Sequence, residues 1–430
     1  MKTTQDSRHR EPGFDTLQVH GGQTFDCGAR ACAVPICQSA SFGFHDAGHA
    51  ARLFTGQEAG HIYSRMSNPT TDVLEKRVTL LEGGVGSVAT ASGTAAIFYA
   101  IFTIARSGDE FISSKALYGG TIHLFENVFR DMGITVHLVD ISDQSEIEAR
   151  MGKKTRAIFT ETIGNPMNTV ADLRMLSEVA HAHGIPLIVD STVTTPYLVR
   201  PFEHGADVVV HSLTKFMGGH GLSIGGIVID AGTFCWDTFS ALSRPDPEMD
   251  GQSFIERFGD AAYIARLRSA ILRDTGACMS PFNAFTFLLG IETLSLRMAK
   301  HCGNALKVAQ FLDGHPDVAW VNYPGLADHP DHGRAEVYLR NGFGAIIAFG
   351  AKGGYEQARE IIDSVRLFSH VANIGDTKSL IIHPASTTHK LLSEEQQRSS
   401  GVSPDMIRLC VGIEDIDDIL ADLEAALGKA

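Results

Sequence analysis

A single lysine, Lys215, stands between the apolar run 207–212 and a glycine-rich stretch that begins at Gly218. An amine at the junction of a strand and a loop is costly to bury, so an unpaired lysine there has a lowered pKa and attacks carbonyl groups as a nucleophile. Ser212 and Thr214 add hydroxyls that suit phosphate oxygens. A surface lysine in a flexible loop accounts for the same residue types, so Lys215 alone leaves both interpretations open.

The glycines between 218 and 226 have a loose G-x-G-x-x-x-G-like spacing that invites comparison with dinucleotide-binding loops. Those loops connect a strand to a helix. Residues 223–230 predict a second strand instead, because they lead into a short apolar run. The pattern therefore does not indicate a nicotinamide site.

Two other polar corners also follow predicted strands. Ser92, Gly93 and Thr94 precede a helix, where free backbone N–H groups and the helix dipole favour an anion. A plain N-cap by Ser92 or Thr94 is the simpler interpretation of that corner alone.

Asp190 ends the apolar run 185–189. It either caps a loop or holds a proton on a ring nitrogen, since a buried anion favours a cationic partner.

Together these three corners match the needs of one common cofactor. In an open α/β sheet, ligands bind outside the carboxyl ends of the strands, so all three corners can line one crevice. Pyridoxal 5′-phosphate needs a lysine for a Schiff base, an acid at its pyridine nitrogen and a phosphate cup. Lys215, Asp190 and the corner at 92–94 supply this set, which predicts a pyridoxal-phosphate site.

The segments that carry these residues alternate between short apolar runs and amphipathic helices. Predicted strands cover 87–92, 109–114, 134–140, 155–161, 185–190 and 207–212, and predicted helices cover 71–83, 94–108, 121–133 and 172–184. This alternation is typical of an α/β fold with a mostly parallel sheet and helices on both faces. A long helical stretch at 284–312 then leads into mixed strands and helices, which predict a smaller α+β C-terminal domain.

The predicted organisation has three parts. Residues 1–62 are irregular and form an N-terminal arm. Residues 63–285 form the cofactor-binding α/β domain, in which an insert at about 231–282 interrupts the alternation of strands and helices. Residues 286–430 form the C-terminal domain.

Composition narrows the possible partners. The 430 residues include 36 basic and 50 acidic side chains, and the net charge of −14 argues against nucleic acid. The polar first residues contain no apolar signal core, and the longest apolar run, 95–105, is too short for a membrane span. These features favour a cytoplasmic protein without a membrane partner.

The cysteines raise the question of a metal. Cys27, Cys32 and Cys37 lie at equal spacings near His20 and His45. Zinc ligands usually come in closer pairs, so reduced cysteines and no metal are expected.

The chain resembles a known family of pyridoxal-phosphate enzymes of cysteine and methionine metabolism. This family is the cystathionine γ-synthase group of fold type I. The motifs YSRMSNPT, ASGTAAI, LYGGT, ETIGNP, VDST, HSLTKFMGGH, HPASTTH and IRLCVGIED occur in family order. The resemblance runs nearly from end to end, and it implies the PLP-dependent transferase fold.

The resemblance also implies roles for the matching residues. Lys215 would hold the cofactor and then move protons on the substrate, and Asp190 would keep the pyridine nitrogen protonated. Tyr118 of LYGGT would stack on the ring and help to activate the incoming amine or protonate a leaving group. The phosphate would be bound by Gly93, Thr94, Ser212 and Thr214.

Other matching residues would bind substrate or reach a second subunit. Arg408 lies in an apolar run, where a solvent-facing arginine is an equal alternative; in the family this residue pairs with the substrate α-carboxylate. Asn373 would lie near that carboxylate and Asn165 near the cofactor O3′. Tyr63 and Arg65 of IYSR would complete the phosphate site of a neighbouring subunit, which implies a dimer at least. The family usually forms homotetramers of paired active dimers.

Within the family, the stretch at 287–305, the insert and the segment NIGDTKSLIIHPASTTH resemble O-acetylhomoserine sulfhydrylases. The implied reaction is γ-replacement, in which O-acetyl-L-homoserine and sulfide or a small thiol give L-homocysteine or methionine and acetate. Gly120 stands where methionine γ-lyases have cysteine, whereas Thr94 departs from the glutamine common in sulfhydrylases. Methionine γ-lyase, cystathionine γ-synthase or O-succinylhomoserine sulfhydrylase activity stays open, as does a catalytically silent protein of the same fold.

Overall fold

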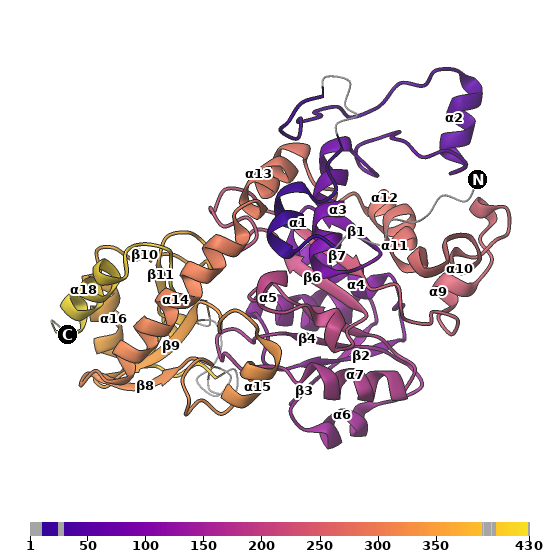
Figure 1. Cartoon of the computed structure of the whole chain (residues 1–430). Helices are drawn as coiled ribbons and strands as arrows, with labels where there is room; N and C mark the ends of the chain where they lie inside the picture. The colour runs from indigo at the N-terminus through magenta and orange to yellow at the C-terminus, as the bar shows by residue number, and fades with distance from the viewer. Residues whose placement is uncertain (1–10, 25–29, 389, 391–396, 398–400, 429–430) are drawn as a thin grey trace.

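The computed structural model describes residues 11–24, 30–388, 390, 397 and 401–428, and the strands in these ranges form two sheets (Figure 1). The larger sheet has the strand order β1-β7-β6-β5-β4-β2-β3. Its strands are β1 Gly86–Thr90, β2 Glu110–Ser114, β3 Thr135–Val139, β4 Thr155–Glu161, β5 Leu187–Asp190, β6 Val208–Ser212 and β7 Gly226–Asp230.

Most of this sheet is parallel, as the sequence predicts. Strands β3, β2, β4, β5 and β6 run in one direction, whereas β7 is antiparallel to both β6 and β1. The connection 213–225 contains no helix that could cross over the sheet, so β7 returns beside β6 in the opposite direction. The glycine-rich stretch thus leads into a strand, which confirms that it is not a dinucleotide-binding loop.

Helices cover both faces of the larger sheet. Successive side chains of a strand point to opposite faces. Accordingly, Val208 and Val210 pack in the core beneath α4 (Gly93–Phe102), whereas Val209 packs in the core that includes α3 (Pro69–Glu82) and α7 (Leu173–Ala182). Burial on both faces explains why these strands are almost continuously apolar.

The helix α4 ends earlier than its composition suggests. Its N-terminus is capped by Ser92, whose Oγ accepts from the N–H of Ala95 at 3.1 Å. The predicted end was Gly108, but the helix stops at Phe102. Arg106 donates to the carbonyl oxygens of Phe102 and Ala105, so its guanidinium satisfies groups at the C-terminus of the helix.

The insert packs against the same face as α4. Its short helices are α9 Ser240–Ser243, η3 Pro247–Met249, α10 Phe254–Phe258, η4 Gly259–Ala261, α11 Ala262–Arg266, η5 Leu267–Leu272 and α12 Arg273–Thr275. Arg268 of η5 donates to Glu75 Oε2 of α3 at 2.6 Å and to the carbonyl oxygen of Ser87 in β1 at 2.8 Å. This buried ion pair fixes the insert to the larger sheet.

The predicted long helix at 284–312 is two helices, α13 (Pro281–Ile291) and α14 (Leu294–Asp313), with a break at Glu292 and Thr293. Figure 1 shows α14 running from the larger sheet to the smaller one. The smaller sheet has the order β10-β11-β12-β9-β8, with β8 Val318–Asn322, β9 Ile346–Ala351, β10 Ser369–His370, β11 Leu380–Ile382 and β12 Met406–Cys410. Its pairs are antiparallel except β10 and β11.

The remaining helices flank these layers. They are α1 Phe14–His20, α2 Ala47–Phe54, α5 Gly119–His123, η1 Leu124–Phe129, α6 Gln144–Arg150, α8 Thr195–Leu198, η2 Pro201–His204, α15 His332–Tyr338, α16 Gly354–Ser364, η6 Pro384–Ser386 and α18 Ile416–Leu427. The domain boundaries at 62/63 and 285/286 stay a prediction.

Cys27 lies outside the described residues, and Cys32, Cys37, Cys235, Cys278, Cys302 and Cys410 are free thiols. Among the described residues, no group of three or more His, Cys, Asp or Glu is arranged to hold a metal ion. In the same ranges no helix combines the length and the apolar character that a membrane crossing requires.

We expect Glu75→Ala to destabilise the fold, because it leaves the Arg268 guanidinium without its carboxylate in a largely buried site. Breaking such a pair costs about 3 to 5 kcal/mol, and the partial exposure of Arg268 favours the lower end. The midpoint of denaturant unfolding measures this loss. Arg273→Ala is the control, because the partners of Arg273, Glu248 and Asp274, are largely exposed. Equal shifts in both variants would contradict the structural role of the Glu75 pair.

Candidate active site

A cavity of about 320 Å³ lies at the carboxyl ends of β4, β5 and β6. Its other walls come from the N-terminus of α4, the segment 372–374 and β12 of the smaller sheet. Ten of the predicted site residues line this cavity: Gly93, Thr94, Tyr118, Asn165, Asp190, Ser212, Thr214, Lys215, Asn373 and Arg408. The structure thus brings together residues that are separated by up to several hundred positions in the chain.

Lys215 lies on the turn that follows β6. Its Nζ donates to Oδ1 of Asn373 at 2.5 Å. Burial lowers the pKa of the Lys215 amine, and the nearby positive charge of Arg408 lowers it further. Both effects favour the neutral, nucleophilic form that the sequence predicts.

The acid at the end of β5 is half-buried. Asp190 Oδ1 accepts from the backbone N–H of Thr192 at 2.9 Å, and Thr192 Oγ1 accepts from the N–H of Ser212 at 2.8 Å. Burial raises the pKa of Asp190, and the hydrogen bonds from Thr192 oppose that effect. A protonated ring nitrogen in the cavity would be a cationic partner that favours the ionised form of Asp190.

The corner beside α4 leaves space for an anion. A Cβ on Gly93 would lie 2.6 Å from Cβ of Ser212 and 2.9 Å from its Oγ, so no larger residue fits between the helix and β6. The first N–H groups of α4 have no partner within the helix and carry the positive end of its dipole. The Oγ1 of Thr214 lies at the same corner and exchanges hydrogen bonds with the backbone of Gly225.

Arg408 of β12 is buried, with 8% of its surface exposed, and so is not the solvent-facing arginine that the sequence left open. Its Nη1 donates to Oδ1 of Asn165 and its Nη2 to the carbonyl oxygen of Asn373, both at 3.2 Å. Burial lowers the pKa of Arg408. Within the described part of the chain no carboxylate pairs with this guanidinium, so it can receive a carboxylate from a ligand.

Tyr118 precedes α5 and is 55% exposed. Its backbone N–H donates to Oε1 of Glu161 at 2.8 Å, which fixes the start of the helix. A Cβ at Gly120 would lie 2.4 Å from Cε1 of the tyrosine ring, so glycine is required at 120 for this ring position.

Tyr63 and Arg65 are not among the residues that line the cavity. The Arg65 guanidinium lies 5.4 Å from the centre of the Tyr63 ring, and Tyr63 is 44% exposed. This placement agrees with the expectation that both residues act on a neighbouring subunit, which stays a prediction.

Glu161 and Thr192 line the cavity but were not predicted from the sequence. Glu161 ends β4 beside Asp190 in the register of β4 and β5. The rule that selected Asp190, a carboxylate at the carboxyl end of a strand, applies equally to Glu161 and is the signal that could have found it. Burial raises the pKa of Glu161 well above its usual value, and the neighbouring charge of Asp190 raises it further. Burial and the neighbouring charge therefore favour the protonated form of Glu161.

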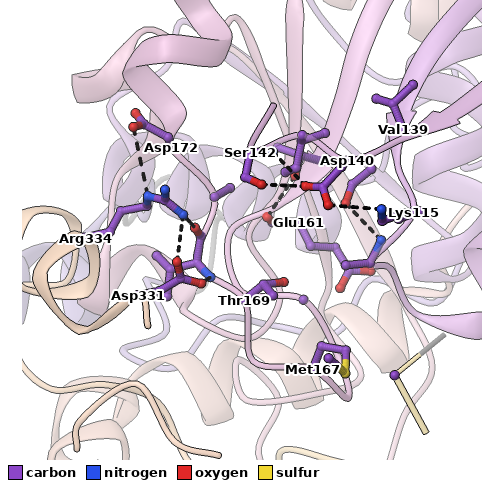
Figure 2. A pocket seen from close by; sticks show the side chains of 18 of the residues that line it. Lys115, Val139, Asp140, Ser142, Glu161, Met167, Thr169, Asp172, Asp331 and Arg334 are labelled. Atoms are coloured by element: carbon purple, nitrogen blue, oxygen red, sulfur yellow. Dashed lines mark hydrogen bonds and ion pairs between the residues drawn. The ribbon is translucent and has the colours of Figure 1, made fainter. Parts of the chain in front are cut away.

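Glu161 also lines a second hollow, of about 370 Å³, at the ends of β2 and β3 (Figure 2). Figure 2 shows Lys115 facing Asp140, at 3.0 Å, and Arg334 facing Asp331, at 2.9 Å. These cations are paired within the chain, so this hollow gives no comparable reason to expect a ligand.

The cavity fits pyridoxal phosphate. It supplies a buried amine, a carboxylate for a ring nitrogen and a corner that a Cβ on Gly93 would fill, which are the three groups that this cofactor needs. The fold and the site together define a pyridoxal-phosphate-dependent enzyme of fold type I.

Comparison with known proteins assigns the family. The chain belongs to the Cys/Met metabolism PLP-dependent enzymes, whose family model matches residues 15–428. It is 52% identical over 424 residues to the O-acetyl-L-homoserine sulfhydrylase of Leptospira meyeri, with 96% of each chain covered. It is 48% identical over 422 residues to the homocysteine synthase of Schizosaccharomyces pombe, covering 97% of this chain and 98% of the relative.

A solved structure extends the comparison to three dimensions. A Campylobacter jejuni protein assigned as an O-acetylhomoserine (thiol)-lyase superposes with a TM-score of 0.93 at 42% identity, covering 97% of this chain and 100% of the other. That structure contains N′-pyridoxyl-lysine-5′-monophosphate, a lysine joined to the cofactor. The predicted family, fold type and cofactor are confirmed, and the roles of individual residues stay predictions.

We expect Glu161→Gln to keep most of the activity and Glu161→Ala to lose about tenfold or more in kcat/KM, because alanine leaves the partly buried N–H of Tyr118 without its acceptor. The pH profile adds a second readout. As pH rises through the raised pKa of Glu161, the wild type gains a second anion beside Asp190 and its activity falls, whereas the glutamine variant stays neutral. A glutamine variant as impaired as the alanine variant would contradict this account.

Proposed function

We propose that the protein catalyses γ-replacement, converting O-acetyl-L-homoserine and sulfide or a small thiol into L-homocysteine or methionine and acetate. One observation carries the proposal: Lys215, Asp190 and Arg408 converge on a single cavity that fits pyridoxal phosphate and one amino acid. The sulfhydrylase and homocysteine synthase relatives, each matched over nearly the whole chain, support the choice of reaction.

The substrate carboxylate is bound by Arg408. Its guanidinium is buried and held by the oxygens of Asn165 and Asn373, so its orientation is fixed before the ligand arrives. A planar fork of N–H donors matches a carboxylate in a bidentate way, which lysine does not reproduce. This contact sets the direction in which the rest of the substrate extends.

Lys215 moves the protons. Pyridoxal phosphate, when bound, supplies an electron sink that stabilises negative charge on the substrate carbons. Burial and the charge of Arg408 lower the pKa of the Lys215 amine, which favours the neutral form that a general base must reach in each cycle. Asn373 Oδ1 accepts a hydrogen bond from the Lys215 amine at 2.5 Å.

Apolar side chains make up part of the cavity lining. They are Ile97, Ile163, Val193, Ile224 and Ile374, and they limit access of water to the reacting carbons. Among the described residues that line the cavity, the basic side chains are Lys215 and Arg408. The proposal already uses Lys215 for proton transfer and Arg408 for the substrate α-carboxylate. An acetyl ester brings no second carboxylate that would need a further cation, so it suits this cavity better than a succinyl ester.

A γ-lyase is the nearest alternative. Its characteristic cysteine is replaced by Gly120, and a Cβ there would displace the Tyr118 ring. The absence of that cysteine favours γ-replacement over elimination in the proposed function. A catalytically silent protein has no need to keep a buried lysine, aspartate and arginine in one cavity.

The proposed assembly is a homotetramer of two active dimers in the cytoplasm. Tyr63 and Arg65 lie outside their own cavity, and the exposed Tyr63 is available to a second subunit. In a two-fold dimer each subunit would then complete the phosphate corner of the other.

The decisive experiment incubates the pure holoenzyme with O-acetylhomoserine and sulfide and measures homocysteine and 2-oxobutyrate. We expect homocysteine as the main product, and 2-oxobutyrate as the main product would overturn the proposal in favour of a γ-lyase. Lys215→Ala should lose about 10²-fold to 10⁴-fold in kcat, the usual contribution of a positioned acid or base. It should also lose the visible absorbance of the lysine-linked cofactor, and a retained band would remove Lys215 from this role.

The shared site can be tested by mixing two inactive variants. Arg65→Ala and Lys215→Ala should each be inactive, but co-expressed chains should recover about a quarter of the wild-type rate, since half of random dimers pair the two variants and each such dimer has one intact site. Absence of recovery in verified mixed oligomers would show that Arg65 acts within its own subunit.

A further inference from the structure

One arginine outside the cavity is bound to the turn that carries Lys215. Arg297 in the first turn of α14 is buried, with 5% of its surface exposed. Its Nη1 donates to the carbonyl oxygen of Phe216 at 2.7 Å, and its Nη2 donates to the carbonyl oxygens of Met217 at 3.1 Å and Gly290 at 2.6 Å. Two of these three carbonyls directly follow Lys215 in the chain.

The charge of Arg297 is held by neutral groups. Among the described residues no carboxylate lies within ion-pair distance of its guanidinium, and burial lowers its pKa to about 10. A cation in the first turn of its own helix is also disfavoured by the helix dipole. The contact with Gly290 near the C-terminus of α13 offsets that cost, because carbonyls there carry the negative end of the α13 dipole.

Glycines allow this close approach. Gly219 has φ +72, and a Cβ there would lie 2.1 Å from Nη1 of Arg297. A Cβ on Gly290 would lie 2.3 Å from the carbonyl oxygen of Gly218. Larger residues at either position would push the turn away from the joint between α13 and α14.

We infer that Arg297 is a positioning residue for Lys215: it ties the lysine-bearing turn to the α13–α14 joint and so fixes where the Lys215 amine can reach. The inference rests on the proposed role of Lys215. A lysine in place of Arg297 keeps the charge but lacks the planar fork that spans several carbonyls, so it should restore the function in part. Arg297 is not among the residues that line the cavity.

The test compares the holoenzyme with Arg297→Lys, Arg297→Gln and Arg297→Met. We expect kcat for homocysteine formation to fall about 10²-fold in the glutamine and methionine variants, the effect of displacing a reacting group by about 1 Å. The KM for O-acetylhomoserine should change less than about threefold, because Arg408 still binds the carboxylate. The pH at which the visible band of the lysine-linked cofactor changes should also shift, and the lysine variant should be intermediate in each readout.

Arg106→Gln is the matched control, because Arg106 also donates to backbone carbonyls, at the end of α4 away from the cavity. It should lower thermal stability and leave kcat and the band unchanged. The inference is overturned if folded Arg297→Lys and Arg297→Gln keep kcat and the band of the wild type, or if they differ from it in stability alone. If Arg297→Met does not fold, these two variants decide. If Lys215→Ala loses the visible band while the Arg297 variants keep the wild-type kcat and band, this inference is wrong. The proposed function is unaffected by that result.

Discussion

Two basic side chains share one cavity, and the rest of the site is arranged around that constraint. Arg408 is buried and Lys215 is half-buried, and within the described structure each is held by amide oxygens of Asn165 or Asn373 instead of a carboxylate. Neutral partners satisfy the N–H groups without cancelling a charge. Burial and the neighbouring charge of Arg408 together lower the pKa of Lys215.

Two acids also line the cavity. Asp190 and Glu161 end neighbouring strands, and two anions so close would repel each other. Hydrogen bonds from Thr192 oppose the rise in the pKa of Asp190, whereas burial and the neighbouring charge raise the pKa of Glu161 well above its usual value. In the proposed site Asp190 would face the cofactor ring, whereas Glu161 accepts from the backbone N–H of Tyr118. Different environments give two similar side chains different tasks.

Much of this arrangement can be predicted from sequence because the chemistry lies at strand ends. Lys215, Asp190 and Gly93 each follow an apolar run, and the parallel sheet brings such ends to one edge, so their types and positions already indicated a pyridoxal-phosphate site. The role of Arg408 required the family resemblance, because its run was equally compatible with a solvent-facing side chain. Glu161 has the same strand-end signal as Asp190, since it ends β4. Arg297 has no such signal, because its importance depends on backbone groups that approach it in three dimensions. The break between α13 and α14 was missed for a similar reason, since helix periodicity continues through Glu292 and Thr293 while the joint is set by tertiary contacts.

The position of Arg408 in the chain affects how the site can assemble during synthesis of the protein. The arginine lies on β12, which is paired on one side with β11 and on the other with β9, so it is placed only when strands from three separate segments have assembled. Its partner Asn165 is 243 residues earlier in the sequence. A chain emerging from the ribosome can complete the sheet that bears Lys215 long before β12 is synthesised, and contacts of such separation form slowly. The growing polypeptide can therefore carry Lys215 on a completed sheet before the part of the pocket that holds Arg408 has formed.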